Sequence, residues 1–164
     1  MPNRFVVATS EASSDFMASA ISDVLYDART LLDMDIAFVS EFFESHRFIR
    51  QVEKAPASTV VIEQGQSNPL EETYCQRVVD GRLPLAIPDT QLLPEAEALD
   101  ITKALNIRAY LAAPITLSNG QIFGTLCCIS HRPRTALGNR QVDALRMIAQ
   151  RVAVELQRNL SIRK

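Results

Sequence analysis

Three cysteines are the side chains in this sequence whose type most suggests chemistry. Cys75 lies in the stretch NPLEETYCQRVVDGRLPLAIPD, residues 68–89, whereas Cys127 and Cys128 are adjacent. A reactive thiol needs exposure, a lowered pKa and a resolving partner. Neighbours on a strand point to opposite faces, so at most one of the adjacent pair can meet Cys75. We expect Cys127 and Cys128 to be buried small hydrophobic residues, and a thiol-based redox sensor or reductase stays an alternative function.

The two histidines give no support for a metal or a catalytic site. His46 and His131 lie far apart in the sequence, and neither has cysteines or acidic residues beside it at ligand spacing. No glycine-rich phosphate loop, paired carboxylates or nucleophile–histidine–acid order stands out. We therefore expect that the chain by itself is not an enzyme.

Composition limits the class of protein. The chain has 164 residues, 47% hydrophobic and 22% charged, which suits one globular domain. A net charge of -2 provides no basic surplus, so we expect neither nucleic acid nor a membrane surface as partner. Residues 109–130 are uncharged, but a turn at Ser118–Gln121 divides them into two strands. Three cysteines make no disulfide framework, which favours the reducing cytoplasm.

Two long helices are predicted at the ends of the chain. Their apolar positions alternate steps of three and four residues. Ser13 or Ser14 is the expected N-cap of the first helix, and the second starts near Asn139. The positions are Met17, Ile21, Val24, Ala28 and Leu31, then Val142, Leu145, Ala149, Val152 and Leu156. This spacing is that of a coiled-coil seam and suggests a homodimer through the terminal helices. Alternatively, each helix simply packs on its own sheet.

The middle of the chain predicts strands and short helices. Residues 35–42 and 47–53 form a first hairpin, 59–62 a third strand, 85–87 a fourth, and 107–117 with 121–130 a final hairpin. A helix is expected over 68–80, because Asn68 suits the N-cap, Pro69 the first turn and Glu71 the third position, with Gly81 as the stop. Another helix is expected over 94–105. The predicted fold class is α/β of the α+β type, with an antiparallel sheet.

The final two strands are apolar almost throughout, so both faces of the sheet should be covered. If the terminal helices cover one face, the segments around 68–80 and 92–105 are available as a lid over the other. A small-molecule pocket between lid and sheet follows as an expectation.

The residues at this point resemble a family. Tyr74-Cys75-Gln76, the strand PLAI with Pro88-Asp89, the stretch IRAYLAAPI at 107–115 and FGTL at 123–126 are similar to the GAF domain, a sensory module of signalling proteins, from about Ala18 to Leu156. The resemblance implies a six-stranded antiparallel sheet, a pocket on one face, and terminal helices that dimerise. It also implies that these helices pass a signal to an attached kinase, diguanylate cyclase or phosphodiesterase.

The resemblance and the strand pattern together suggest the ligand-binding residues. Tyr110 and Ala112 share one face of their strand, and Cys128 shares a face with Ser130, but which face meets the lid is left open. The candidate set is Cys75, Val78, Asp89, Arg108, Tyr110, Ala112, Cys128 and Ser130.

The cofactor is unknown at this stage. Bilin-binding GAF domains attach their chromophore to a cysteine in a helix that corresponds here to residues 94–100, and that segment has no cysteine. The Asn-Lys, Phe and Asp-Glu signature of cyclic-nucleotide-binding members is missing from residues 88–110. Bilin, haem and metal are therefore not expected.

The sequence thus predicts a non-catalytic sensory GAF module of a bacterial signalling protein that binds an unknown small molecule. A ligand-free dimerisation scaffold is the first alternative. The expected organisation is a flexible leader at 1–14, one domain at 15–160, and a tail at 161–164 that leads toward an output domain.

Overall fold

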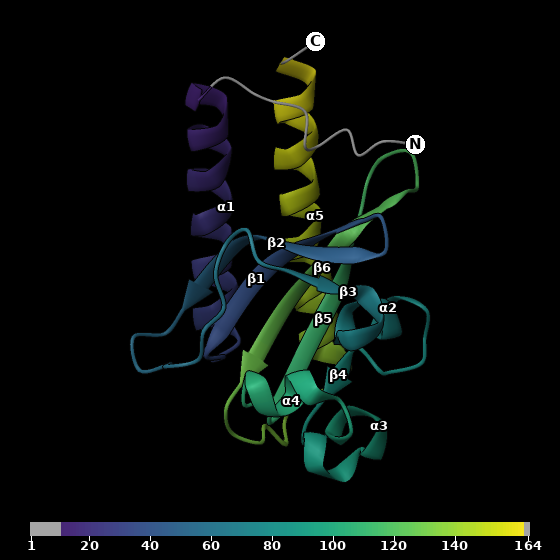
Figure 1. Ribbon diagram of the computed structural model, residues 1–164. Helices are drawn as coiled ribbons and strands as arrows, with labels where there is room; N and C mark the ends of the chain where they lie inside the picture. The colour runs from purple at the N-terminus through teal and green to yellow at the C-terminus, as the bar shows by residue number, and fades with distance from the viewer. Residues whose placement is uncertain (1–10, 163–164) are drawn as a thin grey trace.

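The computed structural model describes the backbone of residues 11–162 and the side chains of residues 19–158. Most of the predicted leader and the last two residues of the predicted tail lie outside this range. The six strands form one sheet in the order β3-β2-β1-β6-β5-β4 (Figure 1). Every neighbouring pair is antiparallel. The predicted α+β class with a six-stranded antiparallel sheet is confirmed.

Two hairpins form the centre of the sheet. Strands β1 (Ile36–Phe43) and β2 (His46–Lys54) are joined by Glu44 and Ser45, whose φ angles of 50° and 66° are those of a tight turn that matches strand twist. Strands β5 (Ala109–Thr116) and β6 (Ile122–Ser130) are joined by the predicted turn, in which Leu117 N–H donates to the carbonyl of Gln121. Two short strands, β3 (Ser67–Pro69) and β4 (Ala86–Ile87), form the edges.

The two terminal helices cover one face of the sheet. Helices α1 (Glu11–Leu31) and α5 (Asn139–Ile162) lie side by side there (Figure 1). The other face is covered by short elements: η2 (Leu70–Glu72), α2 (Tyr74–Val79), η3 (Thr90–Leu92), α3 (Pro94–Glu97) and α4 (Asp100–Ala104). We call these short elements the lid. Of the helices in the described residues, none combines the length and the apolar character needed to cross a membrane.

The alternation of side chains along β5 and β6 settles which face meets the lid. Leu111, Ala113, Leu126 and Cys128 belong to the core beneath α1 and α5. The lid-side core contains Tyr110, Ala112, Cys127 and Ile129. The sheet therefore separates two hydrophobic cores, and consecutive residues along β5 and β6 belong to opposite cores.

The apolar stripe of α5 lies inside the molecule. Its five residues are all buried in the helix-side core: Val142, Leu145, Ala149, Val152 and Leu156. Because this stripe already covers the sheet and α1, it is not available as a seam for a second copy. In α1, Ile21, Val24 and Ala28 are likewise buried, whereas Leu31 is 71% exposed. The buried residues of α1 and α5 therefore follow the alternative interpretation, in which each helix packs on its own sheet.

The predicted third strand at 59–62 is wrong. Residues 58–63 have no strand structure, although Ile62 is buried in the lid-side core. The edge of β2 pairs instead with the chain that follows, where Ile49 N–H donates to Gln66 and Ser67 lies opposite Phe48. A β-branched run makes a strand only where a partner edge is available, and here that edge is taken.

The predicted helix over 68–80 is interrupted. Asn68 and Pro69 lie in β3, residues 70–72 form one 3₁₀ turn, and the α-helix begins only at Tyr74. The Asn68 side chain does not cap a helix, because its Oδ1 accepts a hydrogen bond from Arg47. Cys75 does lie on a helix, as predicted, and Gly81 follows its end with a φ of 85°. The predicted helix at 94–105 is also split, since Leu99 has extended backbone between α3 and α4.

Gly124 allows β1 and β6 to approach closely. A Cβ atom at this position would lie 1.9 Å from the carbonyl oxygen of Ser40. The pairing of β1 with β2 shifts register between Val39 and Ser40, at the same residue that approaches Gly124. This close contact places Ser40 and Thr125 over the centre of the lid-side core.

Candidate functional site

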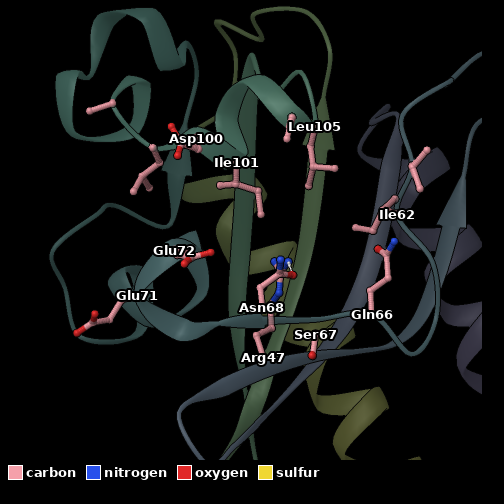
Figure 2. A pocket seen from close by; sticks show the side chains of 14 residues that line it. Arg47, Ile62, Gln66, Ser67, Asn68, Glu71, Glu72, Asp100, Ile101 and Leu105 are labelled. Atoms are coloured by element: carbon pink, nitrogen blue, oxygen red, sulfur yellow. Dashed lines mark hydrogen bonds between the residues drawn. The ribbon is translucent and has the colours of Figure 1, made fainter.

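A pocket of about 590 Å³ opens between the lid and the β2–β3 edge. Figure 2 shows its lining, which comes from β2, the loop before β3, η2 and the segment around α4. Polar and charged residues of the lining are Arg47, Gln66, Ser67, Asn68, Glu71, Glu72 and Asp100. Apolar residues are Val61, Ile62, Ala98, Leu99, Ile101, Ala104 and Leu105. Its volume suits a small organic ligand.

Arg47 is the buried residue at the base of the pocket. Its side chain is on β2, and the residue is only 4% exposed. Nη2 donates to Asn68 Oδ1 over 2.6 Å, the guanidinium lies 5.5 Å from the centre of the Phe38 ring, and Nε has no hydrogen-bond partner. Among the described residues no carboxylate forms an ion pair with Arg47. Buried charges are ordinarily paired, so this cation is incompletely compensated.

Cys75 lies against this guanidinium. Its Sγ is 3.7 Å from Arg47 Nη1 and 3.8 Å from Ser40 Oγ. Burial raises the pKa of the Cys75 thiol, but a hydrogen bond from Cys127 and the charge of Arg47 outweigh it, and the pKa lies well below its usual value. The Cys75 sulfur thus accepts a hydrogen bond from Arg47.

Cys127 extends the buried polar cluster across the sheet. Its Sγ lies 3.9 Å from Cys75 Sγ, 3.1 Å from Tyr110 Oη and 3.1 Å from Thr125 Oγ1. Burial, together with the hydrogen bond to Cys75, raises the pKa of Cys127 well above its usual value. Burial also raises the pKa of Tyr110. The pKa values of the two thiols are therefore shifted in opposite directions, that of Cys75 downward and that of Cys127 upward.

Tyr74 joins the two halves of the lid. Its ring packs on Tyr110 with a centroid separation of 4.6 Å, and its hydroxyl contacts Thr102 of α4 over 2.5 Å. Burial raises the pKa of Tyr74 to about 12, so the phenol stays protonated. A change at α4 is thereby linked to α2 and to the centre of the sheet.

Four of the eight predicted site residues lie in the lid-side core: Cys75, Val78, Tyr110 and Ala112. Asp89 and Arg108 form an ion pair of 3.4 Å, and Asp89 also caps η3 by accepting from Gln91 N–H. Ser130 Oγ donates to the carbonyl of Arg132. The pocket described above is lined by none of the eight. The core residues lie beneath it, whereas Asp89, Arg108 and Ser130 hold loop ends.

The prediction that Cys128 binds the ligand needs a correction. It lies in the core beneath α1 and α5, on the opposite side of the sheet from the lid. Strand alternation sends it there because Cys127 faces the lid. Cys128 therefore cannot line a lid-side pocket.

The sequence interpretation missed the residues that do line the pocket. Arg47 carried a detectable signal, because it shares strand parity with the buried Ile49, and an arginine on an apolar face is unusual. Asn68 was misread as a helix cap. Glu72, Asp100 and Leu105 carried no signal, since only the folding of the lid brings them together.

Comparison with known proteins identifies the family. The family model for the GAF domain matches residues 17–156. The chain belongs to the GAF domain family. No curated protein matches the sequence.

Solved GAF structures share the fold. The blue-light absorbing form of the PixJ GAF domain from Thermosynechococcus elongatus is 20% identical with a TM-score of 0.74, covering 95% of this chain and 94% of its own. The phycoerythrobilin-bound GAF domain of a cyanobacterial phytochrome is 12% identical with a TM-score of 0.68, covering 97% and 100%. The GAF-B domain of DevS from Mycobacterium smegmatis is 18% identical with a TM-score of 0.64, covering 90% and 97%.

These similarities correct the cofactor expectation. Residues 94–100 lack a cysteine, which predicts that no bilin is bound, yet the structural neighbours include GAF domains solved with phycoerythrobilin and phycocyanobilin. The expectation against bilin was therefore wrong, because GAF domains of this fold have been solved with bilins bound.

Proposed function

We propose that this GAF domain is a sensory module that binds a small molecule in the pocket between lid and sheet, without catalysis of its own. The observation that carries the proposal is a cavity of about 590 Å³ with the incompletely compensated guanidinium of Arg47 at its base. A domain that served only as a scaffold would gain stability by filling this space and replacing the buried cation. The sensory character of the family supports the same interpretation.

The signal would travel through the sheet. A ligand at Arg47 changes what compensates its charge and therefore the contacts of Cys75, which in turn meets Ser40 of β1 and Cys127 of β6. The opposite face of those strands carries α1 and α5. A ligand can shift the packing of α5 only by as much as its affinity differs between two arrangements. We propose that α5 passes this shift to an attached output domain.

The test uses two neighbouring positions of α4. Ala104 lines the pocket, whereas Lys103 is exposed and does not line it. Native mass spectrometry of the freshly purified chain is expected to show a co-purified small molecule. Ala104→Trp should remove that molecule and Lys103→Trp should retain it, with both variants melting near the wild-type temperature. Retention of the molecule by Ala104→Trp would refute the pocket as its site.

The expected homodimer remains a proposal and needs a different surface. Along α5, Met147 is 69% exposed and Val154 is 52% exposed, two turns apart on the outer face. We propose that a dimer through the terminal helices would use these residues in place of the buried stripe.

A thiol-based redox sensor is the second candidate function, favoured by the Cys75–Cys127 contact. In this scheme the Cys75 thiolate attacks one oxygen of hydrogen peroxide, the O–O bond breaks, and a sulfenic acid forms. The other oxygen leaves as hydroxide, which takes up a proton to become water. The Cys127 thiol then attacks that sulfur, a second water leaves, and a disulfide forms, so two thiols supply the two electrons that reduce one peroxide. Cys75 is 0% exposed, so opening of the six-residue helix α2 must come first.

Counting thiols after peroxide treatment tests this candidate. The wild type should lose two thiols and gain an intramolecular disulfide, whereas Cys75→Ser should not form it. Cys128→Ser is the matched control, because burial on the other face raises the pKa of Cys128 to about 12. If peroxide leaves all three thiols of the native protein intact, the redox function is refuted.

A further inference from the structure

We propose that the ligand of the lid-side pocket is a free α-amino acid with an apolar side chain, bound as a zwitterion. Its carboxylate would pair with Arg47 at the base of the pocket. Its ammonium group would face Glu71, Glu72 and Asp100 at the mouth. This inference rests on the proposed function, because it assigns a chemical class to the ligand of that same pocket.

The guanidinium at the base of the pocket is complementary to a carboxylate. Arg47 is only 4% exposed. Its Nη2 contacts the amide oxygen of Asn68, its Nη1 contacts the sulfur of Cys75, and its Nε has no hydrogen-bond partner. The planar guanidinium presents paired N–H groups whose spacing matches the two oxygens of a carboxylate. Asn68 Oδ1, 2.6 Å from Nη2, fixes the orientation of the fork.

The carboxylates at the mouth of the pocket are complementary to a positively charged group. Glu71, Glu72 and Asp100 all line the pocket and are exposed. Figure 2 shows them on the α2 and α4 side of the opening, away from Gln66 and Ser67. Among the described residues none of the three is in an ion pair. A ligand that is only anionic would be repelled by this acidic mouth, and one that is only cationic would bring no negative charge to Arg47.

The wall between base and mouth is apolar. Ile62 is 2% exposed and Leu105 is 7% exposed, and Ile101 also lines the pocket. Aliphatic walls bind apolar side chains without selecting a shape closely. The pocket therefore has positions for the three parts of an apolar amino acid: carboxylate, ammonium and side chain.

Calorimetric titration of the 164-residue chain tests the charge pattern with four probes. These are L-leucine, L-phenylalanine, 4-methylpentanoate, which is leucine without its amine, and 3-methylbutylamine, which is leucine without its carboxylate. At least one of the two amino acids should bind, and leucine should bind at least ten-fold more tightly than either half-molecule. Equal binding of a half-molecule, or binding of no amino acid, would overturn the inference.

Variants of the lining test which residues bind the carboxylate and the ammonium group of the ligand. Arg47→Met should weaken amino-acid binding at least ten-fold and leave binding of 3-methylbutylamine unchanged, while Arg47→Lys should restore part of the loss. Glu72→Gln combined with Asp100→Asn should weaken amino-acid binding and improve that of 4-methylpentanoate. Glu63→Gln is the control, because Glu63 is exposed and outside the pocket lining. Circular dichroism of each variant verifies the fold, and a folded Arg47→Met that binds leucine with wild-type affinity contradicts the inference.

The two proposals fail in different ways. If native mass spectrometry shows a molecule that is not an amino acid, such as a bilin or a dicarboxylate, and Ala104→Trp removes it, the sensory pocket stands and the zwitterion inference falls. If both amino-acid titrations and the mass spectrum show no binding, both proposals fall.

Discussion

The sulfur atoms of Cys75 and Cys127 lie 3.9 Å apart and join the lid helix α2 to strand β6. The next residue, Cys128, points the other way into the core beneath α1 and α5. A single step along the strand thus separates the polar cluster under the pocket from the packing of the long helices.

The first prediction concerns the titration of Cys75. Because Arg47 and Cys127 lower the pKa of the folded thiol, thiolate absorbance near 240 nm should rise well below the ordinary thiol pKa of about 8.5. Arg47→Met should move this rise to higher pH, since it removes the neighbouring charge. Cys75→Ser should abolish it, and an unchanged rise in Cys75→Ser would mean that another thiol is responsible.

The second prediction follows from the first by linkage. The folded protein holds fewer protons than the unfolded chain between the lowered pKa of Cys75 and the unfolded value of about 8.5, so the free energy of unfolding should rise with pH across that window. The contribution is fully present above the unfolded pKa and is lost as pH falls through the folded pKa. Urea unfolding from pH 6 to 9, that is, up to about half a unit above the unfolded thiol pKa, should show a steeper rise for the wild type than for Cys75→Ser. Parallel curves would contradict the lowered pKa.

The third prediction concerns Gly124. Its Cβ would lie 1.9 Å from a backbone oxygen of Ser40, which no side-chain rotation can relieve. Gly124→Ala should therefore lower the free energy of unfolding by about 1–3 kcal/mol or more. At Gly138 a Cβ meets nothing within 4 Å, so Gly138→Ala is the matched control and should be neutral or slightly stabilising. Equal effects of the two substitutions on urea unfolding would show that the approach of β1 to β6 is not this close.

The fourth prediction compares two arginine ion pairs. Arg50 Nε lies 2.6 Å from Glu41, whose side chain is 2% exposed, whereas Arg82 and Asp80 are both exposed. Burial raises the pKa of Glu41 even with Arg50 in place. Arg50→Ala should cost about 1–3 kcal/mol of unfolding free energy, because it leaves a buried carboxyl group without its hydrogen-bond partner. Arg82→Ala should leave stability unchanged, and a reversed order would refute the role assigned to burial.

The fifth prediction separates core from surface on α5. Leu145 is 0% exposed, so Leu145→Ala should cost about 2–5 kcal/mol. Met147→Glu with Val154→Glu should leave the melting temperature nearly unchanged, because both residues are exposed. If the chain sediments as a dimer through its terminal helices, only the double glutamate variant should become a folded monomer. A dimer that survives in that variant would place the interface elsewhere.

The sequence and structure differ most clearly at Asn68. The pattern Asn-Pro-Leu-Glu predicts a helix start, because each residue suits its position in the first turn. In the fold the edge of β2 pairs with residues 67–69 and Arg47 binds the Asn68 side chain, so the helix is delayed until Tyr74. The local preference for a helix is thus outweighed by pairing with β2 and by the hydrogen bond from Arg47, which lie some twenty residues earlier in the chain.

The sequence by itself determined the α+β class, the two hairpins, the long terminal helices and the GAF family. Periodicity and turn residues act over a few positions, so the chain shows them directly. Only the tertiary structure decided that Tyr110 and Cys127 face the lid, that Cys128 does not, and that Arg47 meets Asn68 and Cys75 at the base of a pocket. Strand parity has two equivalent solutions until the helices choose a face, and a pocket exists only where distant segments close around it.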